Sequence, residues 1–248
     1  MIKFRCSSLS KIMAGAGASL TESAKKFICE AFDSWERGVR YEFSSKETEK
    51  GTIMESEAIT LVKNELVREC ANLKEKKELD SYQKNEINYK NEWLTGTPDV
   101  IYARGKYKFI DDIKCSFTRA SWLYSVASIL ENREVNEDYY WQLQGYMMLT
   151  GAHEAYLVYC LMDTPQHIVN GLISKSTYNL DFLEAQKAAQ NIEKLHEFGD
   201  FERVFRAKVQ RDDKDIEKIK KRVEMANSWI DRYIYRNIPE QELEVFTA

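Results

Sequence analysis

The spacing of apolar and polar positions changes along the chain, and the change predicts helices first and strands afterwards. The early helices are expected at 7–14, 19–38 and 50–70. A capping-box pattern, Ser19-x-x-Glu22, stands at the start of the second of them. The charged stretch 74–80 predicts a solvated loop or the end of a helix.

Strand patterns begin near residue 84 and then alternate with helical ones. The run "AYLVYCLM" at 155–162 is continuously apolar and rich in β-branched and aromatic residues, which predicts a buried strand after a helix, a crossover arrangement. The other strands are expected at 84–90, 93–103, 106–115 and 201–210, and the other helices at 118–131, 136–150, 181–198 and 213–236. Together these elements predict a mixed α/β fold with a central mixed β-sheet flanked by helices.

Length and composition agree with a folded protein in the cytoplasm. The 248 residues suit one large domain or two small ones, and 44% apolar with 31% charged residues is ordinary for a soluble globular chain. No apolar run approaches the roughly 18 residues that span a bilayer. The apolar run at the N-terminus is interrupted by polar residues, so we expect no signal peptide; these are Ser7, Ser8, Ser10 and Lys11.

Cysteine spacing and charge restrict the chemistry further. The five cysteines are scattered without a CxxC pair, which argues against a zinc site, an iron–sulfur cluster or a disulfide framework. The net charge of −4 argues mildly against a nucleic-acid partner. Residues 203–222 nevertheless carry nine Lys/Arg against four Asp/Glu, so a local basic surface is compatible with the sequence.

The stretch "GTPDVIYARGKYKFIDDIKCS" at 96–116 predicts a β-hairpin that turns near Gly105. Asp112 shares a strand face with Lys114, whereas Asp111 points to the opposite face. Across the hairpin Asp99 falls nearly level with Asp112, so the two carboxylates can approach within about 5 Å. Such a pair favours a hard divalent cation between the carboxylates. The alternative is a solvated pair of acids near the edge of a sheet.

Two helices carry a polar side chain on an otherwise apolar face. Glu55 lies in line with an apolar stripe of the helix at 50–70, where an unpaired carboxylate would be costly; the stripe consists of Ile59, Val62 and Leu66. The alternative places Glu55 at the edge of that stripe, paired with a nearby lysine. In the helix at 136–150, Gln142 and Tyr146 share a face with Gly145 and Leu149. A buried amide and phenol there need hydrogen-bond partners, unless the helix only presents one polar residue at an interface.

The pieces follow one another in the order G-x3-E, P-D, D-x-K and Q-x3-Y. In this order the chain resembles the PD-(D/E)XK nuclease superfamily, and more closely the phage exonucleases of the lambda-exonuclease and YqaJ type. The matching segments cover most of 6–163, while 164–248 match only in general pattern. The resemblance implies one nuclease domain over 1–248, with a restriction-endonuclease-like core, a helical N-terminal region and a helical C-terminal extension.

The resemblance also implies a metal site. Asp99, Asp112 and the backbone carbonyl of Ile113 would be direct ligands of Mg²⁺, for which Mn²⁺ would substitute. Glu55 would bind a second metal ion or one of its waters. Two carboxylates and a backbone carbonyl are the oxygen ligands that Mg²⁺ prefers.

Further roles follow from the same resemblance. Lys114 would hold and help to deprotonate the attacking water, or stabilise negative charge on the phosphate. Gln142 and Tyr146 would orient Lys114 and the water. The N-terminal candidates for binding a 5′-phosphate of DNA are Arg5, Ser7 and Ser8.

Two features depart from the pattern of these nucleases. Ser56 stands where a proline often follows the helix glutamate, and the scattered cysteines do not fit the branch that carries an iron–sulfur cluster. Ser56 is expected to change the geometry of the helix little. Asp111 is a further departure, because it adds a second acid beside the motif.

The expected function is that of a Mg²⁺-dependent DNA exonuclease that degrades one strand from duplex ends, 5′ to 3′, in phage-type recombination by single-strand annealing. By resemblance we expect a homotrimeric ring and a single-strand annealing protein as partner. The alternatives are a structure-specific endonuclease of the same fold and a non-catalytic module that binds DNA ends. A non-catalytic relic would usually have lost one of four residues that this chain retains: Glu55, Asp99, Asp112 and Lys114.

Overall fold

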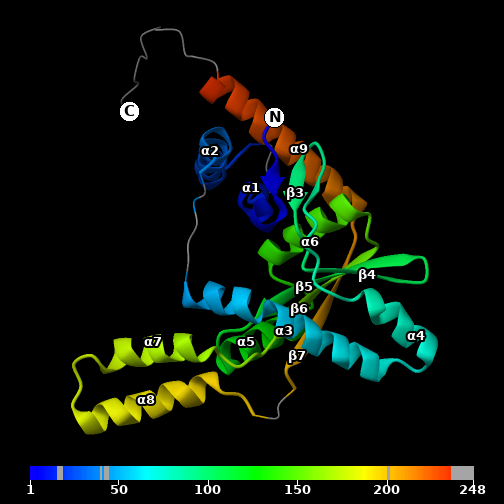
Figure 1. The fold of residues 1–248 in the computed structure, drawn as a ribbon. Helices are drawn as coiled ribbons and strands as arrows, with labels where there is room; N and C mark the ends of the chain where they lie inside the picture. Colours follow the sequence, from blue (N-terminus) through cyan, green and yellow to red (C-terminus); the bar gives the residue numbers. More distant parts are fainter. Residues whose placement is uncertain (16–18, 40, 42–44, 200–201, 236–248) are drawn as a thin grey trace, which may run out of the picture.

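The computed structural model describes residues 1–15, 19–39, 41, 45–199 and 202–235, and within them the chain forms two mixed β-sheets flanked by helices (Figure 1). This confirms the predicted mixed α/β class. Among the described residues, no helix combines the length and the apolar character that crossing a membrane requires.

The main sheet carries the predicted hairpin at one edge. Its strands are β4 (Val100–Arg104), β5 (Tyr107–Cys115), β6 (Glu154–Cys160) and β7 (Val204–Gln210), in that spatial order. β4 and β7 run antiparallel to their neighbours, whereas β5 and β6 are parallel. The parallel pair needs a crossover connection, which consists of α5 (Arg119–Asn132) and α6 (Glu137–Thr150).

A second, small sheet joins the N-terminus to the segment before the hairpin. Its strands are β1 (Phe4–Arg5), β3 (Leu94–Gly96) and β2 (Tyr89–Lys90), in that order. The prediction of one strand over 93–103 is therefore wrong, because the chain leaves the small sheet at Gly96 and enters the main sheet at Val100. Pro98, which has no N–H for a strand ladder, lies in this break. The strand expected at 84–90 is reduced to β2 and a single bridge between Lys84 and Val100.

Each predicted helix is present in the structure, but several begin or end at other residues than predicted. They are α1 (Leu9–Met13), α2 (Glu22–Arg37), α3 (Lys46–Glu69), α4 (Leu73–Glu78), α7 (Gln166–Thr177), α8 (Phe182–His196) and α9 (Asp213–Ile230). Short 3-10 turns at Cys6–Ser8 and Leu79–Ser81 and a π-turn at Asp231–Tyr235 complete them. The helix cap expected at Ser19 is wrong, since the Thr21 side chain accepts the hydrogen bond from Ala24 N.

Other boundaries also differ from the expectation. Ser45 caps α3, so this helix begins before residue 50, and the stretch 74–80 forms α4 and a 3-10 turn rather than only a loop. α7 is not predicted from the sequence. It pairs with α8 as a helical hairpin at one end of the molecule (Figure 1). Residues 201 and 236, at the ends of two predicted elements, lie outside the described residues.

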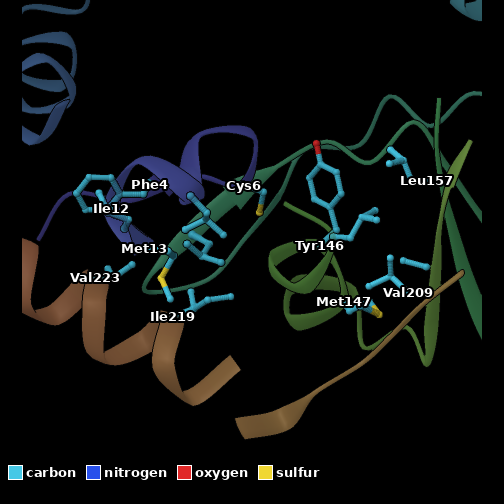
Figure 2. Packing of buried hydrophobic residues seen from close by; sticks show 14 of the residues in the cluster. Phe4, Cys6, Ile12, Met13, Tyr146, Met147, Leu157, Val209, Ile219 and Val223 are labelled. Carbon is cyan, nitrogen blue, oxygen red and sulfur yellow. The ribbon is translucent and has the colours of Figure 1, made fainter. Parts of the chain in front are cut away.

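Apolar side chains fill both faces of the main sheet. On one face Ile110 and Leu157 belong to a cluster that includes α6, α9 and the N-terminal segment (Figure 2). On the other face Ile113 and Val158 pack with the apolar stripe of α3, which confirms that this stripe is buried; the stripe consists of Ile59, Val62 and Leu66. The strand β5 is therefore covered on both sides.

The N-terminal segment is held against α6 by a close backbone approach at Gly145. A Cβ atom at this position would lie 2.6 Å from Leu9 Cδ1 and 3.0 Å from Cys6 Sγ. At the same place a Cβ on Gly96 would lie 2.7 Å from the Tyr146 ring. Figure 2 shows Cys6 beside Tyr146 in this contact. The helix that carries Gln142 and Tyr146 is thereby positioned by residues 6–9.

Gly145→Ala should destabilise the protein by about 1–3 kcal/mol, because the added methyl group overpacks this contact. Gly171→Ala is the matched control. Gly171 lies in the exposed interior of α7 with no atom near an added Cβ, so this change should stabilise by roughly 0.5–1 kcal/mol. Urea denaturation of both variants measures the difference. Equal midpoints for the two would contradict the proposed contact.

Candidate active site

The β4–β5 register brings the predicted carboxylates together. Val100 pairs with Asp111, so continuing the ladder by one residue places Asp99 opposite Asp112, as the sequence predicted. Asp99 Oδ2 accepts a hydrogen bond of 2.7 Å from Ile113 N. Because the N–H and C=O of a strand residue face the same neighbour, the Ile113 carbonyl also faces the side of Asp99.

Asp112 is almost completely buried and has a different environment at each oxygen. Its Oδ1 accepts a hydrogen bond of 3.0 Å from Gln142 Nε2. Its Oδ2 lies 2.8 Å from Lys114 Nζ in an ion pair and accepts no hydrogen bond from the described residues. The same ammonium lies 5.0 Å from the centre of the Tyr139 ring. One lysine thus compensates a carboxylate that water cannot reach.

The electrostatics follow from two acids and one cation. Burial, and then the negative charge of Asp112, raise the pKa of Asp99 to about 8. For Lys114, burial by itself lowers the pKa, but the attraction of Asp112 and Asp99 outweighs it and the pKa rises. In this arrangement Lys114 keeps its proton at neutral pH and Asp99 tends to keep one as well. A bound divalent cation would reverse the preference of Asp99.

The polar side chains of α6 form a short chain that ends on Asp112. Gln142 is buried and also donates a hydrogen bond of 3.1 Å to the Tyr146 hydroxyl. The resemblance implied that these two residues orient Lys114 and the attacking water. In the structure Gln142 bonds to Asp112, and Tyr146 bonds to Gln142. Tyr139, which contacts Lys114, was missed; its spacing to Gln142 and Tyr146 along one helical face is the signal that could have found it.

Glu55 is the predicted residue that the structure keeps apart from the others. It lies at the edge of the α3 stripe, with its side chain 24% exposed, and its Oε1 is 3.0 Å from Lys84 Nζ. This is the alternative considered from the sequence, an edge glutamate paired with lysine. Its negative charge makes a small contribution to the raised pKa of Asp99.

Asp111 lies on the other face of β5, as predicted, in a separate buried network. It is fully buried and accepts hydrogen bonds of 2.8 Å from the Tyr82 hydroxyl and 2.9 Å from Arg206. Arg206 also donates to the Tyr102 hydroxyl. The two adjacent aspartates are therefore compensated by different cations from different elements.

The predicted DNA-binding residues lie on β1 and the following 3-10 turn. Arg5 and Ser8 line one hollow of about 440 Å³, whereas Ser7 is exposed and is not part of its lining. The basic stretch 203–222 looks different in the structure, because most of its cations are bound within the chain. These are Arg203, Arg206, Lys208, Arg211, Lys218, Lys220 and Arg222.

The site offers two carboxylates and one backbone carbonyl to a divalent cation. Within the described residues, no three side chains of His, Cys, Asp or Glu gather closely enough to hold a metal ion by themselves. The fit rests on Asp99, Asp112 and the Ile113 carbonyl. Asp112 Oδ2 is buried without a hydrogen bond. Asp99 has a raised pKa, and a bound cation would stabilise its ionised form.

Comparison with known proteins places this arrangement on a known fold. No protein-family model and no curated protein matches the sequence. Among solved structures, a phage-related exonuclease from Haemophilus somnus 129PT shares 28% identity over 94% of this chain and 96% of that chain, with a TM-score of 0.69. The alkaline exonuclease LHK-Exo from Laribacter hongkongensis shares 15% identity over 92% and 88%, with a TM-score of 0.56. The chain has a phage exonuclease-type fold.

The raised pKa of Asp99 predicts a dependence of stability on pH. The folded protein holds a proton on Asp99 up to pH values near 8, while the unfolded chain loses it near about 3.9. In EDTA the free energy of unfolding should therefore fall as pH rises through this window. Asp99→Asn should flatten that fall, and Asp80→Asn, at an exposed acid, should not. Thermal denaturation across the window measures it; parallel curves for wild type and Asp99→Asn would contradict the assignment.

Proposed function

We propose that the protein is a metal-dependent DNA exonuclease. The observation that carries the proposal is the grouping of Asp99, Asp112 and Lys114 on a fold shared with a phage-related exonuclease at 28% identity over 94% of the chain. Paired carboxylates beside a lysine are what phosphodiester hydrolysis requires. The chain retains all four residues that a non-catalytic relic would usually have lost in part, which supports an enzyme; these are Glu55, Asp99, Asp112 and Lys114.

Asp99, Asp112 and the Ile113 carbonyl would hold Mg²⁺, for which Mn²⁺ would substitute. The ion would supply Lewis-acid stabilisation of the phosphate and lower the pKa of the attacking water. Glu55 would take part in holding a second ion after leaving its ion pair with Lys84.

The chain's own side chains then have distinct tasks. Lys114, an ammonium in this arrangement, would stabilise the negative charge that develops on the phosphate. Gln142 holds Asp112 by a hydrogen bond and is itself held by Tyr146. These two residues would act by fixing the direction of the Asp112 carboxylate.

The substrate would be the end of a DNA duplex. Arg5, Ser7 and Ser8 would contact a terminal 5′-phosphate, since Arg5 forms no ion pair with an acid among the described residues and two serines follow Cys6. This contact supports degradation from 5′ to 3′. The proposed location of the protein is the cytoplasm of a bacterial or phage-infected cell. The proposed role is recombination by single-strand annealing, with an annealing protein as partner. The proposed assembly is a homotrimeric ring.

The deciding experiment compares DNA ends. With Mg²⁺, linear duplex carrying a 5′-phosphate should be digested faster than the same duplex with a 5′-hydroxyl, to mononucleotides and single strand. Closed circular DNA should resist, and EDTA should stop all digestion. Gel analysis of end-labelled substrates measures these rates. Rapid nicking of closed circles under the same conditions would replace the exonuclease proposal by an endonuclease of the same fold.

Lys114→Ala should lower the single-turnover rate by at least about 100-fold, because it removes a cation from the reacting phosphate. DNA binding should weaken far less, as measured by fluorescence anisotropy. Lys106→Ala is the matched control, since Lys106 lies in the turn of the same hairpin. A Lys114→Ala variant that cleaves at the normal rate would remove this residue from the mechanism.

Gln142→Ala should lower the rate by about 10–100-fold with little change in DNA binding, because Asp112 loses the hydrogen bond that directs it. Weaker activation by Mg²⁺ should accompany the loss, measured as a higher Mg²⁺ concentration for half-maximal rate. A normal Mg²⁺ dependence in this variant would show that the amide is only part of the packing.

A further inference from the structure

The hollow of about 440 Å³ near the N-terminus has a chemistry that the proposed hydrolysis does not use. It lies between β1, α1 and α2 and is lined by three cations and four aromatic rings. The cations are Lys3, Arg5 and Lys11, and the rings are those of Phe4, Phe27, Trp35 and Tyr41. Of the lining residues, Arg5 and Ser8 also have a part in the proposed contact with a DNA terminus, whereas Lys3, Lys11 and the aromatic rings do not.

The cations of this hollow are free to bind a ligand. Within the part of the chain that the structure describes, neither Lys3, Arg5 nor Lys11 forms an ion pair with a carboxylate, and Glu30 is the single acid in the lining. Lys11 Nζ lies 4.9 Å from the centre of the Phe27 ring, so a cation and a ring already adjoin there. Three cations against one acid give the lining of the hollow an excess of positive charge.

Two of the aromatic rings, those of Trp35 and Tyr41, are exposed but held in place. Trp35 is 54% exposed and rests on Phe32, with ring centres 5.9 Å apart. Tyr41 is 58% exposed, and its hydroxyl donates a hydrogen bond of 2.6 Å to Asp33. Large planar surfaces that are fixed at one side and open at the other are suited to stacking against flat ligands.

We propose that this hollow binds single-stranded DNA, namely the strand that remains after its complement has been digested. Ammonium and guanidinium groups would contact successive phosphates, and bases would stack on Trp35 and Tyr41 regardless of sequence. A duplex keeps its bases inside the stack, so only a single strand can use these rings. The inference rests on the proposed nuclease function.

The position of the hollow agrees with such a role. Arg5 of β1 pairs with Thr95 of β3, and Thr95 also lines the hollow. The same short segment continues to Asp99 of the candidate active site. A single strand that leaves the site along β3 would meet the hollow, and its binding there would retain the protein on the DNA between cleavage steps.

The test is binding of a fluorescein-labelled (dT)12 oligonucleotide to the full chain in EDTA, where no cleavage is expected, followed by anisotropy. Trp35→Ala should weaken binding by roughly 5- to 150-fold, and Trp35→Phe should largely restore it. Tyr178→Ala is the matched control, because Tyr178 is equally an exposed aromatic residue but lies near the end of the α7–α8 hairpin. It should bind as the wild type does.

The charged part of the hollow has its own readout. Replacing Lys3 and Lys11 together by Ala should reduce the slope of log K against log salt by about 1.4, at roughly 0.7 for each phosphate contact of a single strand. Lys74→Ala, at an exposed lysine of α4, should leave the slope unchanged.

Other outcomes would overturn the proposal in different ways. Equal loss of affinity for blunt duplex and for (dT)12 would show a general electrostatic surface, and dTMP binding as tightly as (dT)12 would show a product site. An unchanged (dT)12 affinity in Trp35→Ala would exclude the stacking platform. Since none of these measurements requires cleavage, they are independent of the deciding experiment for the nuclease function.

Discussion

The repulsion between Asp99 and Asp112 is the constraint around which this site is organised. Two carboxylates face each other across an antiparallel strand pair, and one of them is almost completely buried. Lys114 compensates part of that charge, and the Ile113 N–H and the Gln142 amide each satisfy one oxygen. The remaining negative charge is removed by the proton that Asp99 retains at neutral pH, and a divalent cation would take the place of that proton.

The sheet keeps this site separate from a second buried charge. Asp111 points to the opposite face of β5, where it forms an ion pair with Arg206 and accepts a hydrogen bond from the Tyr82 hydroxyl. Because successive side chains of a strand point to opposite faces of the sheet, the adjacent residues Asp111 and Asp112 lie in independent environments. The network behind the strand can then fix its register without drawing Lys114 away from Asp112.

Much of the architecture was predictable because it depends on local patterns. The alternation in β5 and the turn at Gly105 determine the hairpin register, and this register alone brings Asp99 opposite Asp112. The apolar stripe of α3 was predictable for the same reason. Where the prediction was wrong, a local break or cap decided the outcome, as with Pro98 between the two sheets and Thr21 at the start of α2.

What the sequence could not show are contacts between residues far apart in the chain. The ion pair of Glu55 with Lys84, the placement of Tyr139 over Lys114 and the internal pairing of most cations in 203–222 depend on how the elements pack. A helical period reveals which residues share a face, but it does not reveal which partner that face meets. α7 could have been predicted from the sequence, because its apolar residues recur at helical spacing: Ile168, Val169, Leu172 and Ile173.

The two hydrogen bonds between Ile2 and Asn227 have a consequence for how the protein is made. Ile2 N donates to Asn227 Oδ1 at 2.7 Å, and Asn227 Nδ2 donates to Ile2 O at 3.1 Å, so β1 and α9 close on each other (Figure 1). During synthesis the N-terminal segment must wait for α9, on the order of ten seconds or longer at ordinary translation rates. Ile2 lies in the same short segment as Cys6 and Leu9, which pack on α6, so this segment completes its contacts only after α9 has been made.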